Sequence, residues 1–166
     1  FSPYVALHFA TADTTTFNHD GVIWAVNFEK AHLHLPPLFR DRLEEERAND
    51  FTVEMLSDLD IAPSRLHEAD SADFVLFFEP PSIDDRIVNQ YALFSIHSRA
   101  QGLQDAWFQT HPQLWKRIIL PADLKWEIRD KLDQANVTER VLFPGLDGLS
   151  RWLRRHYSPG PHRKLP

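Results

Sequence analysis

Two polar side chains that could hold a ligand stand four residues apart in the segment Asp-Asp-Arg-Ile-Val-Asn-Gln. Arg86 can bind a phosphate group through its guanidinium, and Gln90 can hydrogen-bond a hydroxyl group. A spacing of four places both side chains on one face of a helical turn. The pair therefore predicts either a site for a phosphate- and hydroxyl-bearing ligand or an ordinary polar helix surface, with Asp84 and Asp85 capping the turn.

A second candidate is the segment His-Leu-His-Leu. His32 and His34 lie on the same side of the chain if this segment is extended. A His-x-His pair can bind zinc, but a zinc site needs further ligands, and the sequence has no Cys and no His-Glu-x-x-His motif. We therefore expect no metal site and interpret the two histidines as part of a half-exposed strand edge.

Most other catalytic motifs are missing from the sequence. It has no Gly-x-Ser-x-Gly elbow, only five glycines and no phosphate-binding glycine loop. The lack of Cys excludes thiolate nucleophiles and disulfides and agrees with a reducing compartment, so we expect a cytoplasmic protein. No apolar run approaches the roughly 18 residues of a membrane span, so we expect no membrane partner.

Basic charge is concentrated near the C-terminus of an otherwise acidic chain. The sequence has 24 acidic and 18 basic residues and a net charge of -6, which gives no overall attraction to nucleic acid. The local basic residues could contact phosphates, with Trp152 and Tyr157 stacking on bases, or they could complement a helix C-terminus. We expect the second role and no nucleic-acid partner. These residues are Arg151, Arg154, Arg155, Arg163 and Lys164.

Apolar runs and helical spacing predict the elements that must position these groups. Four near-continuous apolar runs predict strands that share one sheet, because each is too apolar to stand alone. Their alternation with helical segments predicts an α/β or α+β fold with a mixed sheet of about four to six strands and flanking helices. The predicted strands are residues 21–27, 73–78, 92–98 and 116–120.

Three helices are predicted from apolar spacing and from proline positions. The first begins behind Ser2 and should bury Tyr4, Val5 and Phe9. The second spans residues 122–135, directly after a strand. The last should bury Leu149 and Leu153 before a Ser-Pro-Gly-Pro segment ends it, so that their replacement by Ala would cost about 2–5 kcal/mol.

Five segments resemble, in the same order, the downstream two-thirds of the FRG domain family. The Phe-Arg-Gly tripeptide that names this family does not occur; the nearest string is Phe39-Arg40-Asp41. The resemblance implies that residues 1–157 are the C-terminal portion of one such domain and that residues 158–166 are a tail. It also implies that an upstream segment, or a symmetry mate, covers residues 1–10. The segments are SPYVALHFA, DGVIWAVN, RIVNQYALFSIHS, KRIILPADLKWEIRDKL and VLFPGLDGLSRWLR.

The plan of the FRG family is in turn similar to that of ADP-ribosyltransferases. This similarity implies NAD as a cofactor, with Ser2 and Tyr4 of the first helix near the nicotinamide. It implies catalytic roles for Arg86 and Gln90, because Gln90 stands where those enzymes place a Glu or Gln. Such a site would stabilise the positive centre that forms as nicotinamide leaves. The alternative for Ser2 is a structural role as a helix cap in front of Pro3.

Two functional hypotheses of different classes follow from the sequence. The first is a nucleotide- or NAD-binding, ADP-ribosyltransferase-like effector of a prokaryotic toxin or phage-defence system. The second is a non-catalytic module that binds a protein or a small ligand. The two differ in one observable property, which is whether NAD or ADP-ribose binds near Gln90.

Overall fold

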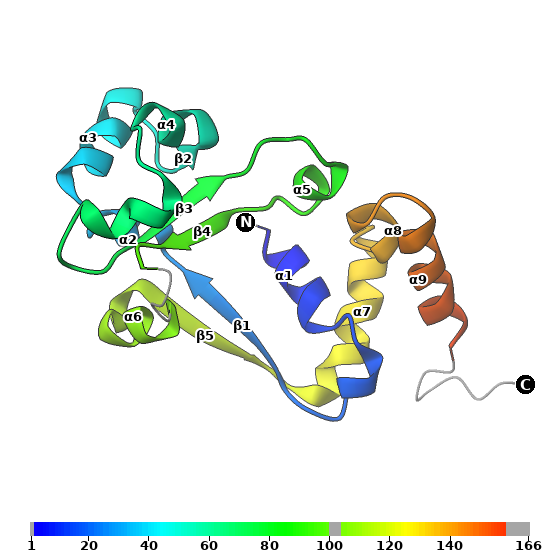
Figure 1. The fold of residues 1–166 in the computed structure, drawn as a ribbon. Coiled ribbons are helices and arrows are strands. Elements are labelled where there is room, and N and C mark those ends of the chain that lie inside the picture. Colours follow the sequence, from blue (N-terminus) through cyan, green and yellow to red (C-terminus); the bar gives the residue numbers. More distant parts are fainter. Residues whose placement is uncertain (1, 100–103, 159–166) are drawn as a thin grey trace, which may run out of the picture. The chain divides into compact units, whose positions relative to one another are not determined.

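The computed structural model describes residues 2–99 and 104–158, in which helices and short strands alternate (Figure 1). The predicted mixed α and β class is confirmed, with five strands in the described residues. The strands are β1 (Gly21–Val26), β2 (Phe51–Thr52), β3 (Val75–Glu79), β4 (Phe94–His97) and β5 (Trp115–Leu120). The α-helices are α1 (Pro3–Ala10), α2 (Phe28–His32), α3 (Pro37–Glu46), α4 (Val53–Asp58), α5 (Asp85–Asn89), α6 (Gln104–Thr110), α7 (Lys125–Gln134), α8 (Glu139–Leu142) and α9 (Leu146–Tyr157). Short 3-10 helices are η1 (Thr14–Thr16), η2 (Pro63–Glu68), η3 (Pro112–Leu114) and η4 (Ala122–Leu124).

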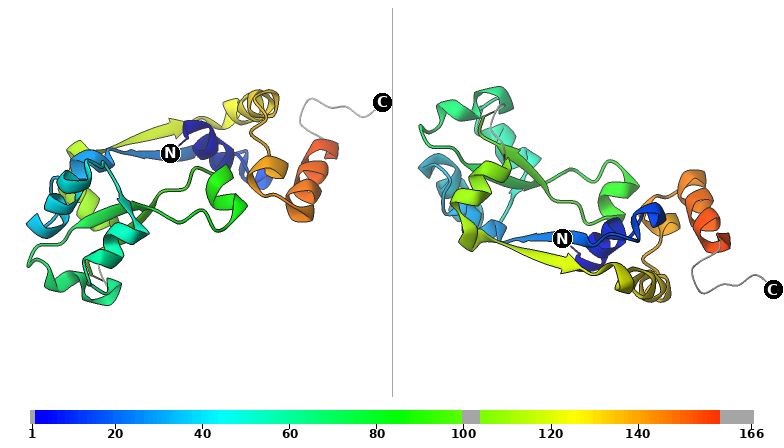
Figure 2. Two further views of the ribbon diagram at one scale, coloured as in Figure 1. Left: turned by 90° about the horizontal axis from the view of Figure 1, so that it is seen from above. Right: turned by 90° about the horizontal axis from the view of Figure 1, so that it is seen from below.

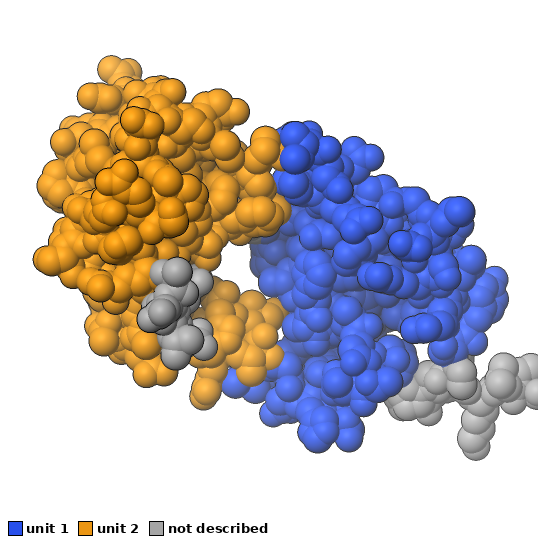
Figure 3. All heavy atoms as spheres, in the orientation of Figure 1, with its two compact units in different colours: residues 1–21, 82–91, 119–166 blue, residues 22–81, 92–118 orange. Residues whose placement is uncertain are grey.

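The chain divides into two compact units, which Figure 3 shows in different colours. Unit 1 combines three stretches, Phe1–Gly21, Ser82–Tyr91 and Ile119–Pro166. Unit 2 combines Val22–Pro81 and Ala92–Ile118. Of the tail predicted at residues 158–166, only Ser158 belongs to the described residues.

A three-stranded sheet with β3 at its centre organises unit 2. β2 lies parallel to β3 on one side, and β4 lies antiparallel on the other, with Val75 opposite His97. β3 is almost entirely apolar and has a neighbour on each edge, so Val75 and Leu76 are both fully buried. The strand ends before Pro80, which has no amide hydrogen for a ladder hydrogen bond.

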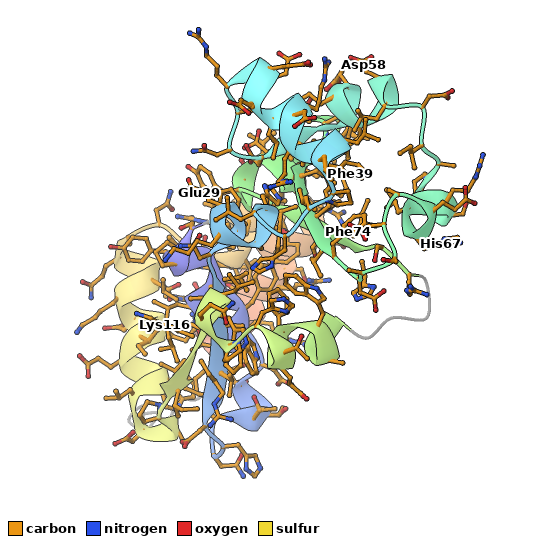
Figure 4. The ribbon with its side chains drawn as sticks, turned by 90° about the vertical axis from the view of Figure 1, so that its left-hand side faces the viewer. Glu29, Phe39, Asp58, His67, Phe74 and Lys116 are labelled. Atoms are coloured by element: carbon orange, nitrogen blue, oxygen red, sulfur yellow. The ribbon has the colours of Figure 1, made fainter. Side chains whose placement is uncertain are left out.

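Phe39 of α3 and Phe74, directly before β3, lie in the larger core of unit 2. The rings of Phe39 and Phe74, labelled in Figure 4, have centroids 5.5 Å apart, and each residue is 1% exposed. α3 begins with Pro37 in its first turn, where the missing amide hydrogen has no cost. It ends at Glu46, because Arg47 adopts a left-handed φ of 51° that stops the helix. The other buried members of this core are Leu35, Leu43, Phe51, Met55, Leu66 and Leu76.

The four segments predicted as strands are all strands, but they divide between two sheets instead of sharing one. β1 pairs with β5, whereas β3 pairs with β4. The prediction assumed that each apolar run needs cover on both faces. In the β1 and β5 pair, Trp24 instead packs on Trp115 at 4.7 Å between centroids and remains 57% exposed.

The first helix of unit 1 buries only part of the set predicted from its sequence. Val5 is buried, as expected, but Tyr4 is 57% and Phe9 50% exposed, so the prediction was wrong for these two side chains. α1 has eight residues and turns a single stripe, formed by Val5 and His8, toward its neighbours. Tyr4 and Phe9 lie at the two edges of this narrow stripe and remain exposed.

The predicted burial of the leucines in α9 is also wrong. Leu149 is 40% and Leu153 39% exposed. The buried side of α9 is set by Gly148, where an added Cβ would lie 1.9 Å from the Phe143 carbonyl oxygen and 2.6 Å from that of Glu139. This close backbone approach fixes the rotation of α9 about its axis, and the leucines then point away from α8.

The core of unit 2 gives a matched test of burial within one helix. Phe39→Ala should lower the free energy of unfolding by about 3–5 kcal/mol, because it leaves a cavity at a fully buried position. Leu38→Ala, at a neighbouring position of α3 that is 47% exposed, should lower it by less than about 1 kcal/mol. Urea unfolding curves of both variants measure the difference. Equal losses would show that α3 does not present Phe39 to the core.

Candidate functional site

A buried network of charged side chains joins the helices of unit 1. Arg155 of α9 donates to Glu139 from Nε at 2.5 Å and from Nη2 at 2.8 Å. It also donates to Asp133 of α7, from Nη1 at 2.8 Å and Nη2 at 2.7 Å. Burial alone would lower the pKa of Arg155, but the hydrogen bonds to Glu139 and Asp133 raise it above its ordinary value. The guanidinium is therefore a permanent link between three helices.

Arg129 of α7 extends this network to α1. It is 2% exposed, and its Nη2 lies 3.4 Å from Asp133 and 3.8 Å from Glu139. Its Nη1 donates to His8 Nδ1 at 2.9 Å, which requires His8 to be neutral with its hydrogen on Nε2. Burial, followed by the charge of Arg129, lowers the pKa of His8 from 6.5 to about 4. The two arginines and two carboxylates balance each other in charge.

Three buried polar atoms of this region have no hydrogen-bond partner among the described residues. They are His8 Nε2, Arg129 Nε and Thr138 Oγ1. The Val137 carbonyl favours the protonated form of His8, opposing the effect of burial, although Nε2 itself makes no hydrogen bond of ordinary geometry. Unpaired buried donors of this kind are uncommon in folded proteins and indicate places where a water or a ligand can bind.

An open cleft of about 740 Å³ lies beside the network, within unit 1. Its volume is in the range of small-molecule sites. Figure 2 shows α7, α8 and α9, whose residues line it, from two further sides. The lining residues are Asp123, Trp126, Glu127, Arg129, Asp130, Asp133, Gln134, Thr138, Arg140, Trp152, Arg155, His156 and Ser158.

The wall formed by η4 and α7 combines one aromatic ring with three exposed carboxylates. Trp126 is half-buried and packs edge-on against Phe17, with centroids 4.7 Å apart. Asp123, Glu127 and Asp130 stand at helical spacing around it. Glu127 is paired with Lys131, whereas Asp123 and Asp130 form no ion pair within the described residues.

The wall formed by α8 and α9 is aromatic and already holds a cation. Trp152 stacks on His156 with ring centroids 5.0 Å apart. The Arg140 guanidinium lies 4.8 Å from the Trp152 centroid, in cation-π geometry. Chemically, the cleft offers aromatic rings and carboxylates, which together attract a cation.

The residues predicted from the sequence lie elsewhere in unit 1. Ser2 precedes α1, but its side chain makes no capping hydrogen bond, and Tyr4 is 57% exposed. Arg86 lies exposed on α5, while the Gln90 amide donates to the Leu142 carbonyl at 3.0 Å. Asp84 caps α5 by accepting from the Arg86 backbone amide at 2.7 Å, as predicted for this turn. The cleft-lining residues include none of the four predicted site residues.

His32 and His34 are not part of an extended strand. His32 ends α2 and is buried, with its Nδ1 2.9 Å from the Asn49 carbonyl and its Nε2 accepting from the Phe77 amide at 3.0 Å. Both ring nitrogens are therefore used in structural hydrogen bonds. His34 is exposed and contacts the His111 ring at 4.6 Å between centroids. Within residues 2–99 and 104–158, no group of three or more acidic or histidine side chains could hold a metal ion.

The C-terminal arginines have separate roles. Arg155 belongs to the buried network, and Arg151 lies over the Phe143 ring at 5.1 Å. Arg154 is exposed. Arg163 and Lys164 fall outside the described residues. No local sequence pattern indicates that one arginine of this group is buried, because the carboxylates that pair with Arg155 come from α7 and α8.

Comparisons with protein-family models, with curated proteins and with solved structures found no match to this chain. The resemblance to the FRG family therefore stays a prediction. None of the helices in the described parts of the chain is long and apolar enough to cross a membrane.

Removing the central arginine tests the network. Arg155→Met should lower the free energy of unfolding by about 3–5 kcal/mol, because it leaves Asp133 and Glu139 without their main partner. Arg40→Met, at an exposed position of α3, should change it by less than about 0.5 kcal/mol. Chemical unfolding measures both. Similar small effects would show that the network contributes little to unit 1.

The lowered pKa of His8 predicts a pH dependence of stability. Between pH 6.5 and about 4 the unfolded chain binds a proton at His8 while the folded protein does not. Stability should therefore fall as the pH falls through this window, by about 3 kcal/mol in total from this group. His8→Gln should flatten that part of the stability profile. An unaltered slope in His8→Gln would contradict the assignment.

Proposed function

We propose that this chain is a non-catalytic ligand-binding module and that the cleft lined by α7, α8 and α9 binds a cationic ligand. The observation that supports this most directly is the wall around Trp126. Asp123 and Asp130 flank this ring without an ion-pair partner in the described residues. An ammonium or guanidinium group of a basic peptide can lie over such a ring while the carboxylates accept its hydrogen bonds.

The charge balance of the cleft supports a cation over an anion. Arg129 and Arg155 line the cleft, but Asp133 and Glu139 neutralise them. Arg140 lies over Trp152 but keeps its charge. It is outnumbered by Asp123 and Asp130, which line the cleft without an ion-pair partner among the described residues. A pyrophosphate would meet these carboxylates at close range, where like charges repel.

Thr138 gives this proposal a second support. Its side chain is 2% exposed, it lines the cleft, and its hydroxyl oxygen has no partner among the described residues. A hydroxyl oxygen accepts a hydrogen bond from an ammonium or from a water bound beside it. The cleft thus combines a ring, carboxylates and an unpaired hydroxyl.

The NAD-binding, ADP-ribosyltransferase-like function is our second proposal. It is supported by Arg86, which is exposed and forms no ion pair with another described residue, so that its guanidinium is available to a phosphate. Gln90 fits it less well, because its amide nitrogen already donates to the Leu142 carbonyl. In this proposal Ser2 and Tyr4 contribute to the same site, and the FRG resemblance supplies its rationale.

A basic peptide and NAD separate the two proposals in one calorimetric experiment. Tetralysine should bind the protein, and Trp126→Ala or Asp130→Asn should weaken binding roughly threefold to tenfold, in keeping with the loss of a cation-π contact or a carboxylate. The matched control Asp41→Asn, an exposed carboxylate on α3, should leave affinity unchanged. Fully acetylated tetralysine should not bind, since it has lost the side-chain charges.

Two results would reject the cation-binding proposal. Heat from NAD or ADP-ribose that disappears in Arg86→Ala or Gln90→Ala, with no heat from tetralysine, would support the second proposal and reject the first. Equal binding of acetylated and unmodified peptide would also reject the cation site. Higher salt should weaken the tetralysine interaction, because exposed charges are screened.

A further inference from the structure

The C-terminal helix exposes a continuous apolar stripe. Leu146, Leu149, Leu153 and Tyr157 are 83%, 40%, 39% and 76% exposed. They stand at positions i, i+3, i+7 and i+11, the spacing of a seam between two helices. Helices of soluble proteins usually turn such a stripe inward, so this one indicates a surface that another molecule covers.

The stripe cannot turn inward within unit 1. Gly148 packs against the carbonyl oxygens of Phe143 and Glu139, and Arg155 is held by Glu139 and Asp133. Both contacts lie on the other side of α9, so they fix its rotation. Figures 1 and 2 show α9 beside α8 within unit 1. The apolar stripe is therefore a fixed outward surface of a well-anchored helix.

We propose that this stripe packs against the same stripe of a second copy of the chain, with the two α9 helices antiparallel. The charges along one edge of the stripe support this partner. Asp147 stands in the first turn of α9 and Arg154 in its last turns, seven residues apart and on the same edge. Neither forms an ion pair with another described residue.

An antiparallel two-fold pair brings equal edges of the two helices together in opposite directions. Asp147 of each copy then faces Arg154 of the other, so two ion pairs form at once. A parallel two-fold pair would instead place this edge of each helix against the opposite edge of its partner, so Asp147 would not meet Arg154. The helix dipoles also favour the antiparallel arrangement, since each N-terminus meets a C-terminus. Ser150, a small residue on this edge, lies near the two-fold axis.

This inference is independent of the proposed cation site. Trp152 and His156, which line the cleft, lie beyond the other edge of the stripe. The same helix therefore presents the cleft on one side and the self-association surface next to it.

Charge reversal tests the pairing by analytical ultracentrifugation of the whole chain. The unmodified protein should form dimers, and Asp147→Arg or Arg154→Asp alone should raise the dissociation constant roughly tenfold, because each creates two like-charge contacts. The double variant Asp147→Arg with Arg154→Asp should restore the dimer. Each single change also opposes the helix dipole, and the double variant opposes it most, so restoration cannot come from helix stability.

A substitution within the apolar stripe is a second test of the proposed dimer. Leu153→Asp should leave the protein monomeric, while the control Ile83→Asp, at a position that is 83% exposed and outside α9, should leave the dimer intact. Circular dichroism of each variant checks that the helices are retained. If the unmodified protein is still monomeric at about 100 μM, the dimer would have a dissociation constant above this concentration, and the proposal would be overturned. So would a dimer that neither charge reversal nor Leu153→Asp affects.

Discussion

The contact between Arg155 and its two carboxylates, Asp133 and Glu139, determines the arrangement of unit 1. These groups come from α9, α7 and the start of α8, so one guanidinium links three helices. Burying charges is unfavourable unless each is paired. A second arginine, Arg129, gives the network two positive side chains for its two negative ones. His8 completes the set as a neutral acceptor from α1. A polar network thus links these helices, beside buried apolar side chains such as Leu132 and Leu142.

Unit 2 is built in the opposite way. Its two clusters are almost entirely aromatic and aliphatic, and β3 contributes to both through alternate side chains. Its one buried histidine, His32, has both ring nitrogens engaged by backbone groups of distant segments. A buried imidazole with both nitrogens satisfied is a structural element of the core.

The cleft and the outward stripe both follow from the orientation of α9. Gly148 permits close contact with α8, and Arg155 points into the network, so that Trp152 and His156 line the cleft and the leucines face outward. A different rotation would bury the leucines and remove Arg155 from its carboxylates. The loss of two buried ion pairs outweighs the gain from covering half-exposed leucines, because an unpaired buried charge is far more costly than an exposed methyl group.

Local sequence patterns determined the elements of this protein: the four apolar runs are strands, the segment after β5 is helical, and Asp84 caps α5. These features depend on neighbouring residues, whose preferences can be read along the chain. Tertiary structure alone decided that the strands form two sheets, that Leu149 and Leu153 are exposed, and that Arg155 is the buried arginine of its group. Each of these depends on partners from distant segments. Apolar spacing predicts that a helix has an apolar face, but what that face packs against is decided by energies, such as those of a buried ion network, that involve residues far apart in the sequence.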